Sequence, residues 1–268
     1  MSSAAERVAA GTGEADLARR FGGVERLYGS AARQSFAAAH VCVVGIGGVG
    51  SWVAEALARS AVGAITLVDL DMVAESNVNR QIHALGDAFG RAKTTAMAER
   101  IAAINPACRV VEIEDFVTPD NLPSLLVDDY DFLIDAIDQV RAKAALIAWW
   151  RRRGGAMVSV GGAGGKSDPT RIAVADLSRT EQDPLLAKVR STLRRDYGFT
   201  REAGRKFGVS AVYSSEPLRR PQEGNSCAAL AGGLNCAGFG SSVCVTASFG
   251  LFAAAQALDH LAANAQRE

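Results

Sequence analysis

The chain has few cysteines and histidines, and their spacing excludes several kinds of site. None of the five cysteines belongs to a Cys-x-x-Cys pair, so the sequence offers no zinc ligands of the usual spacing, and we expect no zinc. An odd number of cysteines without paired spacing also indicates a reducing compartment, and we expect a cytoplasmic protein. The histidines, His40, His83 and His260, are far apart and form no readable Ser-His-Asp triad.

The chain also lacks net charge, because 29 Lys and Arg balance 29 Asp and Glu among 268 residues. There is therefore no overall electrostatic attraction to nucleic acid. Residues 1–18 have no apolar stretch, and we predict a disordered extension rather than a signal peptide. The remaining length suits one compact protein, which we divide into a first domain at 19–165 and an extension at 166–268.

One long segment contains no charged residue at all. It covers residues 224–258, and its part 237–258 is long enough to span a bilayer. The same part is rich in glycine, alanine and serine, and a helix in the core or at a dimer interface explains it equally well. We regard membrane spanning as the less favoured alternative. Cys227 and Cys236 lie in a glycine-rich stretch where a thioester nucleophile could sit, although no neighbouring residue predicts a lowered thiol pKa.

A strand, a glycine turn and a helix form the most informative motif. The apolar run 41–44 leads into the turn 45–50, and a helical pattern follows at 52–59. Glycine lets the backbone approach a phosphate at a helix N-terminus. A second apolar strand at 64–68 ends in Asp69, about 20 residues downstream, where a carboxylate can bind a ribose hydroxyl. The motif predicts a nucleotide site, with NAD, FAD and ATP all open. The glycines of the turn are Gly45, Gly47, Gly48 and Gly50.

The next residues favour phosphate chemistry over hydride transfer. Asp69 and Asp71 lead into the polar segment 75–81, which contains Arg80, and Lys93 opens the following helix. An arginine can hold phosphate oxygens in a bidentate fork, whereas a lysine acts as a point charge on a developing pyrophosphate. A hydride-transfer enzyme needs neither. Taken singly, each cation could equally be a solvated surface charge.

Short apolar strands near residues 41, 65, 109, 131 and 156 alternate with helical patterns near 52, 93 and 143. This alternation predicts βαβ units, an α/β fold and a parallel sheet with right-handed crossovers.

These motifs, in this order, resemble the adenylation domain of the ubiquitin-activating family, which includes the enzymes that activate sulfur-carrier proteins. The match covers about residues 21–165 and implies a Rossmann-like adenylation domain with a smaller C-terminal extension. It rests on residues 45–50, 69–71, 76–81, 90–93 and 135–138. Further segments resemble the tRNA threonylcarbamoyladenosine dehydratases within this family and extend the match over nearly the whole chain. These are residues 20–23, 26–29, 81–85, 115–121, 160–165 and 236–240.

The resemblance implies roles for individual residues. Asp69 would bind the ATP ribose, and Asp138, after the fourth strand, would organise Mg²⁺ and the attacking geometry. Asp138 is the first catalytic candidate, and the others are Arg80, Lys93 and Arg26. An arginine near the N-terminus would reach the γ-phosphate across a homodimer, with Arg26 as first candidate and Arg20 as second. A monovalent cation is a further expectation. The implied nucleotide-binding residues are the four glycines of the turn with Asp69, Asp71, Asn77, Arg80, Gln81 and Lys93.

Residues 166–220 are locally basic, with twelve Lys or Arg against seven Asp or Glu. On a neutral protein such a surplus is typical of a nucleic-acid contact, although a solvated helix face would look the same. Aromatic residues are interleaved with these charges and could stack on an unpaired base or lie in the core. They are Tyr197, Phe199, Phe207 and Tyr213.

By themselves, the glycines, acids and cations predict only nucleotide-dependent activation. The resemblance implies ATP-dependent dehydration of threonylcarbamoyladenosine in a tRNA anticodon loop, through an acyl-adenylate of the threonine carboxylate. Expected partners are tRNA, a second copy of the chain and a sulfur-transfer accessory protein, but not DNA or a membrane. The alternatives are an adenylyltransferase for a sulfur-carrier C-terminus, a non-catalytic ATP-binding scaffold in sulfur transfer, and an NAD oxidoreductase.

Overall fold

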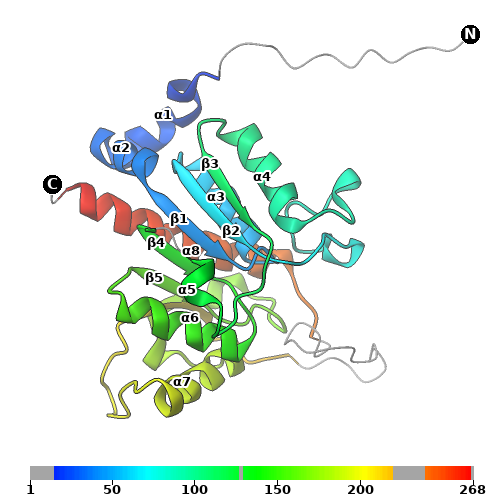
Figure 1. Ribbon diagram of the computed structural model, residues 1–268. Helices are drawn as coiled ribbons and strands as arrows, with labels where there is room; N and C mark the ends of the chain where they lie inside the picture. Colours follow the sequence, from blue (N-terminus) through cyan, green and yellow to red (C-terminus); the bar gives the residue numbers. More distant parts are fainter. Residues whose placement is uncertain (1–14, 127–128, 220–238, 267–268) are drawn as a thin grey trace, which may run out of the picture.

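The protein is built around a seven-stranded sheet with the order β3-β2-β1-β4-β5-β7-β6 (Figure 1). The computed structural model describes residues 15–126, 129–219 and 239–266. Neighbouring strands run parallel except β6, which pairs antiparallel with β7 at one edge. The strands are β1 (His40–Val44), β2 (Ala64–Val68), β3 (Arg109–Ile113), β4 (Phe132–Asp135), β5 (Met157–Val160), β6 (Ile172–Asp176) and β7 (Ser210–Ser214).

The five strands predicted from the sequence are confirmed as β1 to β5, and with them the α/β class. Their order is that of a Rossmann sheet, with β7 in the place of the sixth strand. Strands β6 and β7 were not predicted, because residues 166–220 were considered for their charges and aromatic residues and not for strand patterns. The part of the chain after residue 165 thus contributes two strands to the same sheet.

Helices cover both faces of the sheet. The three predicted helices are confirmed as α3, α4 and α6. Helix α1 begins at Leu17, within the range 1–18 that we expected to be disordered, and residues 1–14 lie outside the described part. The helices are α1 (Leu17–Tyr28), α2 (Ser30–Ala38), α3 (Gly50–Arg59), α4 (Lys93–Ile104), α5 (Leu122–Leu125), α6 (Val140–Arg152), α7 (Pro184–Asp196) and α8 (Val243–Ala265).

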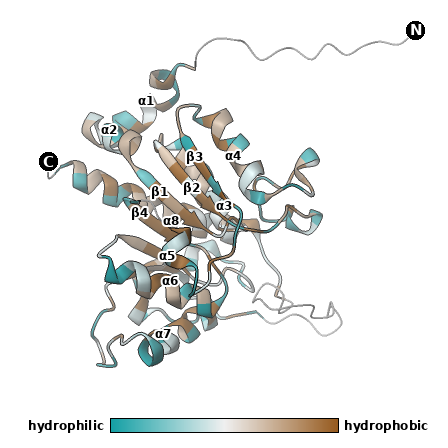
Figure 2. Ribbon diagram, viewed as in Figure 1, coloured by the Kyte–Doolittle hydropathy of each residue, from teal (hydrophilic) through white to brown (hydrophobic). Residues whose placement is uncertain are grey.

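The central strands are buried on both sides, as the largely brown sheet in Figure 2 shows. Val41 and Val43 of β1 belong to a core cluster with α2, α3, α4 and α8, whereas Cys42 and Val44 belong to a second cluster with α5, α6 and α7. Side chains alternate between the faces of a strand, so each face has its own apolar set. Near-continuous apolar strands are typical of a parallel sheet covered by helices.

Helix α8 accounts for much of the long uncharged segment. Its buried side chains recur every four residues and pack against α3 and the sheet. The approach to α3 is close, because a Cβ atom at Gly250 would lie 2.6 Å from the carbonyl oxygen of Val49. Within the described ranges, no helix combines the length and the apolar character needed to cross a membrane. The recurring buried residues are Val245, Phe249, Ala253, Ala257 and Leu261.

Candidate functional site

A cavity of about 430 Å³ opens at the carboxyl ends of the strands, where the strand order reverses between β1 and β4. Ligands of open α/β sheets bind at this switch point. The cavity brings together nearly all the predicted nucleotide-binding residues and the predicted catalytic carboxylate. Those that line it are Gly45, Gly47, Gly48, Asp69, Asp71, Asn77, Arg80, Gln81, Lys93 and Asp138.

The glycine turn is tight enough to require glycine at two positions. Gly45 has a φ of 91°, and a Cβ atom there would lie 2.9 Å from the carbonyl oxygen of Ala136. A Cβ atom at Gly50 would lie 1.7 Å from the carbonyl oxygen of Gly45. Gly50 therefore packs beneath the turn instead of lining the cavity. Because α3 starts at Gly50, the positive end of its dipole lies beside the cavity, where an anion is stabilised.

Asp69 joins the turn to β2 and lies between two backbone donors. Its Oδ2 accepts a hydrogen bond from the Ile46 N–H at 2.6 Å, and its Oδ1 accepts one from the Asp71 N–H at 2.9 Å. Lys93 Nζ lies 3.9 Å from Asp69 and 2.6 Å from an Asp71 carboxylate oxygen. Burial raises the pKa of Asp69, while Lys93 and the N–H donors oppose that shift. A carboxylate has further lone pairs, so Asp69 retains acceptor capacity for a ribose hydroxyl.

Arg80 is held in place by its surroundings. Its Nη1 donates to the Ser76 carbonyl and to Asn79 Oδ1, both at 2.8 Å, and its own carbonyl accepts from Trp52 Nε1 at 2.9 Å. Asn77 fixes the same segment, because its Oδ1 accepts from the Ala74 N–H at 3.0 Å. Burial lowers the pKa of Arg80, yet a guanidinium remains charged. Arg80 thus lines the cavity as a cation that is already held in position.

Asp138 lies in a loop that is held in place by a buried ion pair. Lys143 Nζ lies 2.9 Å from Asp135 Oδ2, and both side chains are completely buried. The same ammonium donates to the Ile137 carbonyl at 3.0 Å, and Ser159 Oγ donates to Asp135 at 2.8 Å. Burial raises the pKa of Asp135, and Lys143 opposes the shift. This pair was not predicted from the sequence. The feature that indicates it is a lysine among the apolar residues of α6.

The part of the cavity wall formed by residues 161–164 and Asp183 was also not predicted from the sequence. Asp183 is 3% exposed, and its two oxygens accept from the N–H groups of Leu186 and Gly162, each at 2.9 Å. The first bond caps α7 and the second holds the glycine-rich loop 161–164, which lines the cavity. A Cβ atom at Gly161 would lie 2.0 Å from Asp183 Oδ2. Gly161 thus permits close packing against a buried acid, whose pKa burial raises.

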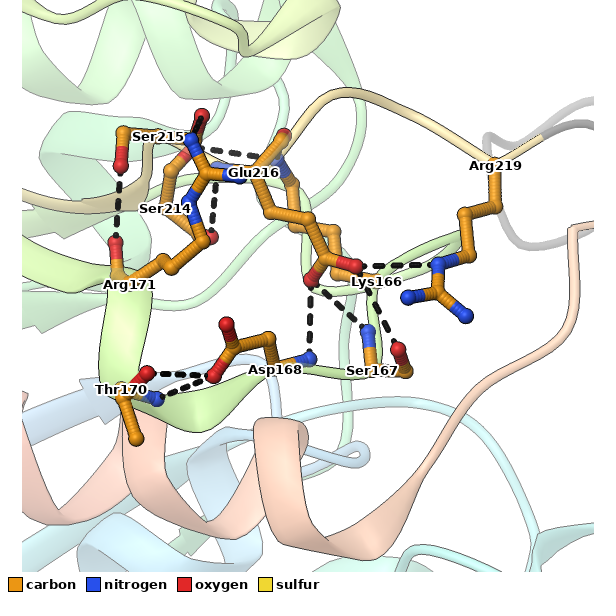
Figure 3. Close-up of polar contacts among 9 residues, drawn as sticks. All are labelled: Lys166, Ser167, Asp168, Thr170, Arg171, Ser214, Ser215, Glu216 and Arg219. Atoms are coloured by element: carbon orange, nitrogen blue, oxygen red, sulfur yellow. Dashed lines mark hydrogen bonds and ion pairs between the residues drawn. The ribbon is translucent and has the colours of Figure 1, made fainter.

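A buried network ties residues 165–168 to the end of β7. Figure 3 shows the carboxylate of Glu216 facing the main chain of Ser167 and Asp168 on one side and Arg219 on the other. Lys166 Nζ donates to three main-chain carbonyls at 2.8 to 3.1 Å. These charges were counted toward a nucleic-acid surface, but Lys166 and Glu216 are each 3% exposed. They therefore serve the fold.

Two predicted arginines are not among the described residues that line the cavity. Arg26 lies exposed on α1. Arg20, the second candidate, donates to the carbonyls of Ala103 and Ile104 at 3.0 and 2.8 Å, and so joins α1 to the end of α4. The candidate thiols Cys227 and Cys236 lie outside the described residues.

His83 is buried beside the cation-rich side of the site. It is 4% exposed, and neither ring nitrogen has a hydrogen-bond partner among the residues the structure describes. Burial, assisted by the charges of Lys93 and Arg100, lowers the pKa of His83 to about 4. The imidazole is therefore neutral near pH 7.

This pKa predicts a loss of stability in acid. As the pH falls below 6.5, the unfolded chain binds a proton that the folded protein does not accept until about pH 4. At pH 5 the cost is about 2 kcal/mol relative to pH 7.5. Urea unfolding at both pH values should show that His83→Gln loses less stability than the unmodified protein. His260→Gln, the control, should retain the full loss, and parallel curves for all three proteins would contradict the assignment.

The glycine turn, Asp69, the two cations Arg80 and Lys93, and Asp138 define an α/β nucleotide-binding protein with a site suited to triphosphate chemistry. The chain belongs to the ThiF family, whose model matches residues 21–266.

Curated relatives and solved structures resemble the chain over nearly its whole length. The tRNA threonylcarbamoyladenosine dehydratase of Escherichia coli is 54% identical over 93% of this chain and 96% of its own length. The protein of the same name from Haemophilus influenzae is 50% identical over 91% of this chain and 93% of its own. The E. coli enzyme has been solved in complex with ATP, and that structure matches with a TM-score of 0.86 and 52% identity, covering 94% of this chain and 97% of that one.

Proposed function

We propose that this protein is an ATP-dependent enzyme that dehydrates N6-threonylcarbamoyladenosine in tRNA. The observation that carries the proposal is one cavity that unites the glycine turn, Asp69, Arg80, Lys93 and Asp138. Whole-length relatives that bear the dehydratase name support it, and the E. coli enzyme has been solved with both ATP and AMP. ATP is the substrate expected when a carboxylate is adenylated, and AMP is the product released when the acyl-adenylate then reacts.

In the first step, an oxygen of the threonine carboxylate attacks the α-phosphorus of ATP, and pyrophosphate leaves. Asp69 holds the ribose, and the start of α3 faces the phosphates with its backbone N–H groups. Asn77, Arg80 and Lys93 bind the phosphate oxygens. These donors are already in position, and they stabilise the negative charge that develops on the leaving pyrophosphate. The polar segment after β2 thus supplies the electrostatic part of catalysis.

We assign Mg²⁺ to Asp138. Within the described ranges, no three His, Cys, Asp or Glu side chains gather so that protein ligands alone could hold a metal ion. Magnesium does not require such a group, because it keeps several waters and is bound through one or two carboxylates together with substrate phosphates. Asp138 lines the same cavity as Arg80 and Lys93 and is such a ligand. A bound Mg²⁺ would neutralise phosphate charge as the α-phosphorus is attacked.

In the second step, the carbamoyl group of the same nucleoside attacks the acyl carbon through its nitrogen or oxygen. AMP leaves with one former carboxylate oxygen, the nucleophile loses its proton, and the ring closes with the net loss of one water. Because nucleophile and acyl group belong to one molecule, proximity lowers the barrier. The reaction is of the ligase type, forms AMP and pyrophosphate, and needs no cysteine nucleophile.

We further propose a cytoplasmic homodimer in which Arg26 reaches the γ-phosphate of the partner's ATP. Its exposed position on α1 supports a role outside its own cavity. The monovalent cation and the sulfur-transfer accessory protein stay predictions.

The direct test measures AMP and pyrophosphate release with ATP and Mg²⁺. tRNA carrying threonylcarbamoyladenosine should stimulate release, and its nucleoside should lose the mass of one water. The same tRNA without the modification is the matched control and should give no stimulation. Equal release with both tRNAs, or stimulation by a small ubiquitin-like protein instead, would refute the dehydratase assignment.

A further inference from the structure

A second hollow lies at the far ends of α6 and α7. It is an open groove of about 730 Å³ between the last turn of α6 and the loop 197–207 that follows α7. Five cationic side chains line this basic groove against one acid, Glu202, which itself lies 3.3 Å from Arg205. All five are exposed. They are Arg151, Arg152, Arg201, Arg205 and Lys206.

Aromatic rings form the floor of the basic groove. Phe207 is 6% exposed and contacts Phe199 edge-on, with ring centroids 5.0 Å apart. The guanidinium of Arg152 lies 5.8 Å from the ring of Tyr197, and that of Arg194 lies 5.2 Å from Phe207. The rings belong to the core and support the arginines, so the core alternative holds for the interleaved aromatics. The groove therefore offers positive charge beside rings that pack against the core.

Two helices connect the basic groove to the ATP cavity. Helix α6 starts directly after Gln139, which lines the cavity, and ends at Arg152 in the groove. Helix α7 likewise starts at Pro184 in the cavity wall and ends just before Tyr197 in the groove. Each helix has 13 residues and is about 20 Å long. The groove is therefore too far away to touch ATP, but within reach of a large substrate seated in the cavity.

Basic residues of the same region have different surroundings. Lys166 is buried on main-chain carbonyls, and Arg190 is half-buried and donates to Thr180 Oγ1. Lys188 and Arg195 are exposed outside the groove. Within the groove, three exposed cations stand together on one loop, namely Arg201, Arg205 and Lys206.

We propose that the basic groove binds the sugar-phosphate backbone of the tRNA stem next to the loop whose modified nucleoside enters the cavity. The inference rests on the proposed function, because that function supplies a polyanion longer than 20 Å. Exposed arginine and lysine bind phosphates and position a nucleic acid without reading its bases. The groove then supplies affinity for any tRNA, and the cavity selects the modified one.

The test removes three charges from the loop: Arg201→Gln, Arg205→Gln and Lys206→Gln together. Binding of modified and unmodified tRNA is measured from 50 to 300 mM salt, with ATP binding as a folding control. At physiological salt the Kd for both tRNAs should rise about tenfold or more, and the slope of log affinity against log salt should fall by about 2 to 3. The kcat at saturating tRNA and the Kd for ATP should stay unchanged.

Two controls define the result. The charge-retaining variant with Arg201→Lys, Arg205→Lys and Lys206→Arg, and Arg19→Gln on exposed α1, should bind tRNA as the unmodified protein does. If the triple glutamine variant keeps both Kd and salt slope, the groove is not the tRNA site, even when the unmodified protein dehydrates its substrate. If affinity falls as expected but the unmodified protein forms no cyclic product, the proposed function fails and the tRNA groove stands.

Discussion

Replacing Asp138 with asparagine is expected to lower the kcat for pyrophosphate release by about 10²- to 10³-fold, the usual effect of removing one group that stabilises developing charge. The change keeps the shape of the side chain and removes the negative charge that we assign to Mg²⁺. Isotope exchange between pyrophosphate and ATP in the presence of modified tRNA would measure the adenylation step by itself.

Two further measurements separate this loss from a structural effect. The free energy of unfolding should stay within about 0.5 kcal/mol, because Asp138 is only half-buried and lies in a loop held by Lys143. Binding of ATP without Mg²⁺ should also be retained, since the phosphate-side cations are unchanged. A variant that keeps a kcat within a few-fold of the unmodified protein would remove Asp138 from the catalytic role.

The Asp138 variant also gives a test for Arg26. Arg26→Ala and Asp138→Asn are each expected to have a strongly lowered kcat when alone. If Arg26 acts on the partner's ATP, mixing the two should restore activity, because a mixed dimer has one site with both groups intact. An inactive mixture that sedimentation shows to contain mixed dimers would place Arg26 in its own chain's site or outside the reaction.

The second large effect is expected from Lys143→Met. The change should lower the free energy of unfolding by about 3–5 kcal/mol, because it leaves the carboxylate of Asp135 buried without its counter-charge. The loop that carries Asp138 also loses its bond from Lys143 Nζ to the Ile137 carbonyl. Urea unfolding measures the first consequence, and pyrophosphate release at a temperature where the variant is folded measures the second.

A double variant distinguishes the two roles of the pair. Lys143→Met combined with Asp135→Leu should regain much of the stability, since apolar residues often replace a buried ion pair without loss. Its kcat should stay low if the pair positions the Asp138 loop. Arg141→Gln, an exposed change on the same helix, should alter neither quantity. A double variant with full activity would show that the pair serves stability alone.

Much of the nucleotide half of the site was accessible from the sequence because its signals are local. The glycine turn, Asp69, Arg80 and Lys93 follow strands or open helices, and the carboxyl ends of parallel strands meet at one edge of the sheet. Asp138 could be placed in the same way, after the fourth strand. The role of Gly50 was less accessible, because only the structure shows that it packs beneath the turn.

The sequence by itself determined the α/β class, the first five strands and the nucleotide side of the cavity, since hydrophobic periodicity and short motifs depend on neighbouring residues. Only the tertiary structure decided which charges serve the fold and which face solvent. Lys143 meets Asp135, Lys166 meets carbonyls at the end of β7, and Asp183 meets Gly162. Such partners are fixed by how helices pack on the sheet. The sequence by itself does not distinguish a lysine in a buried ion pair from a lysine in an exposed groove.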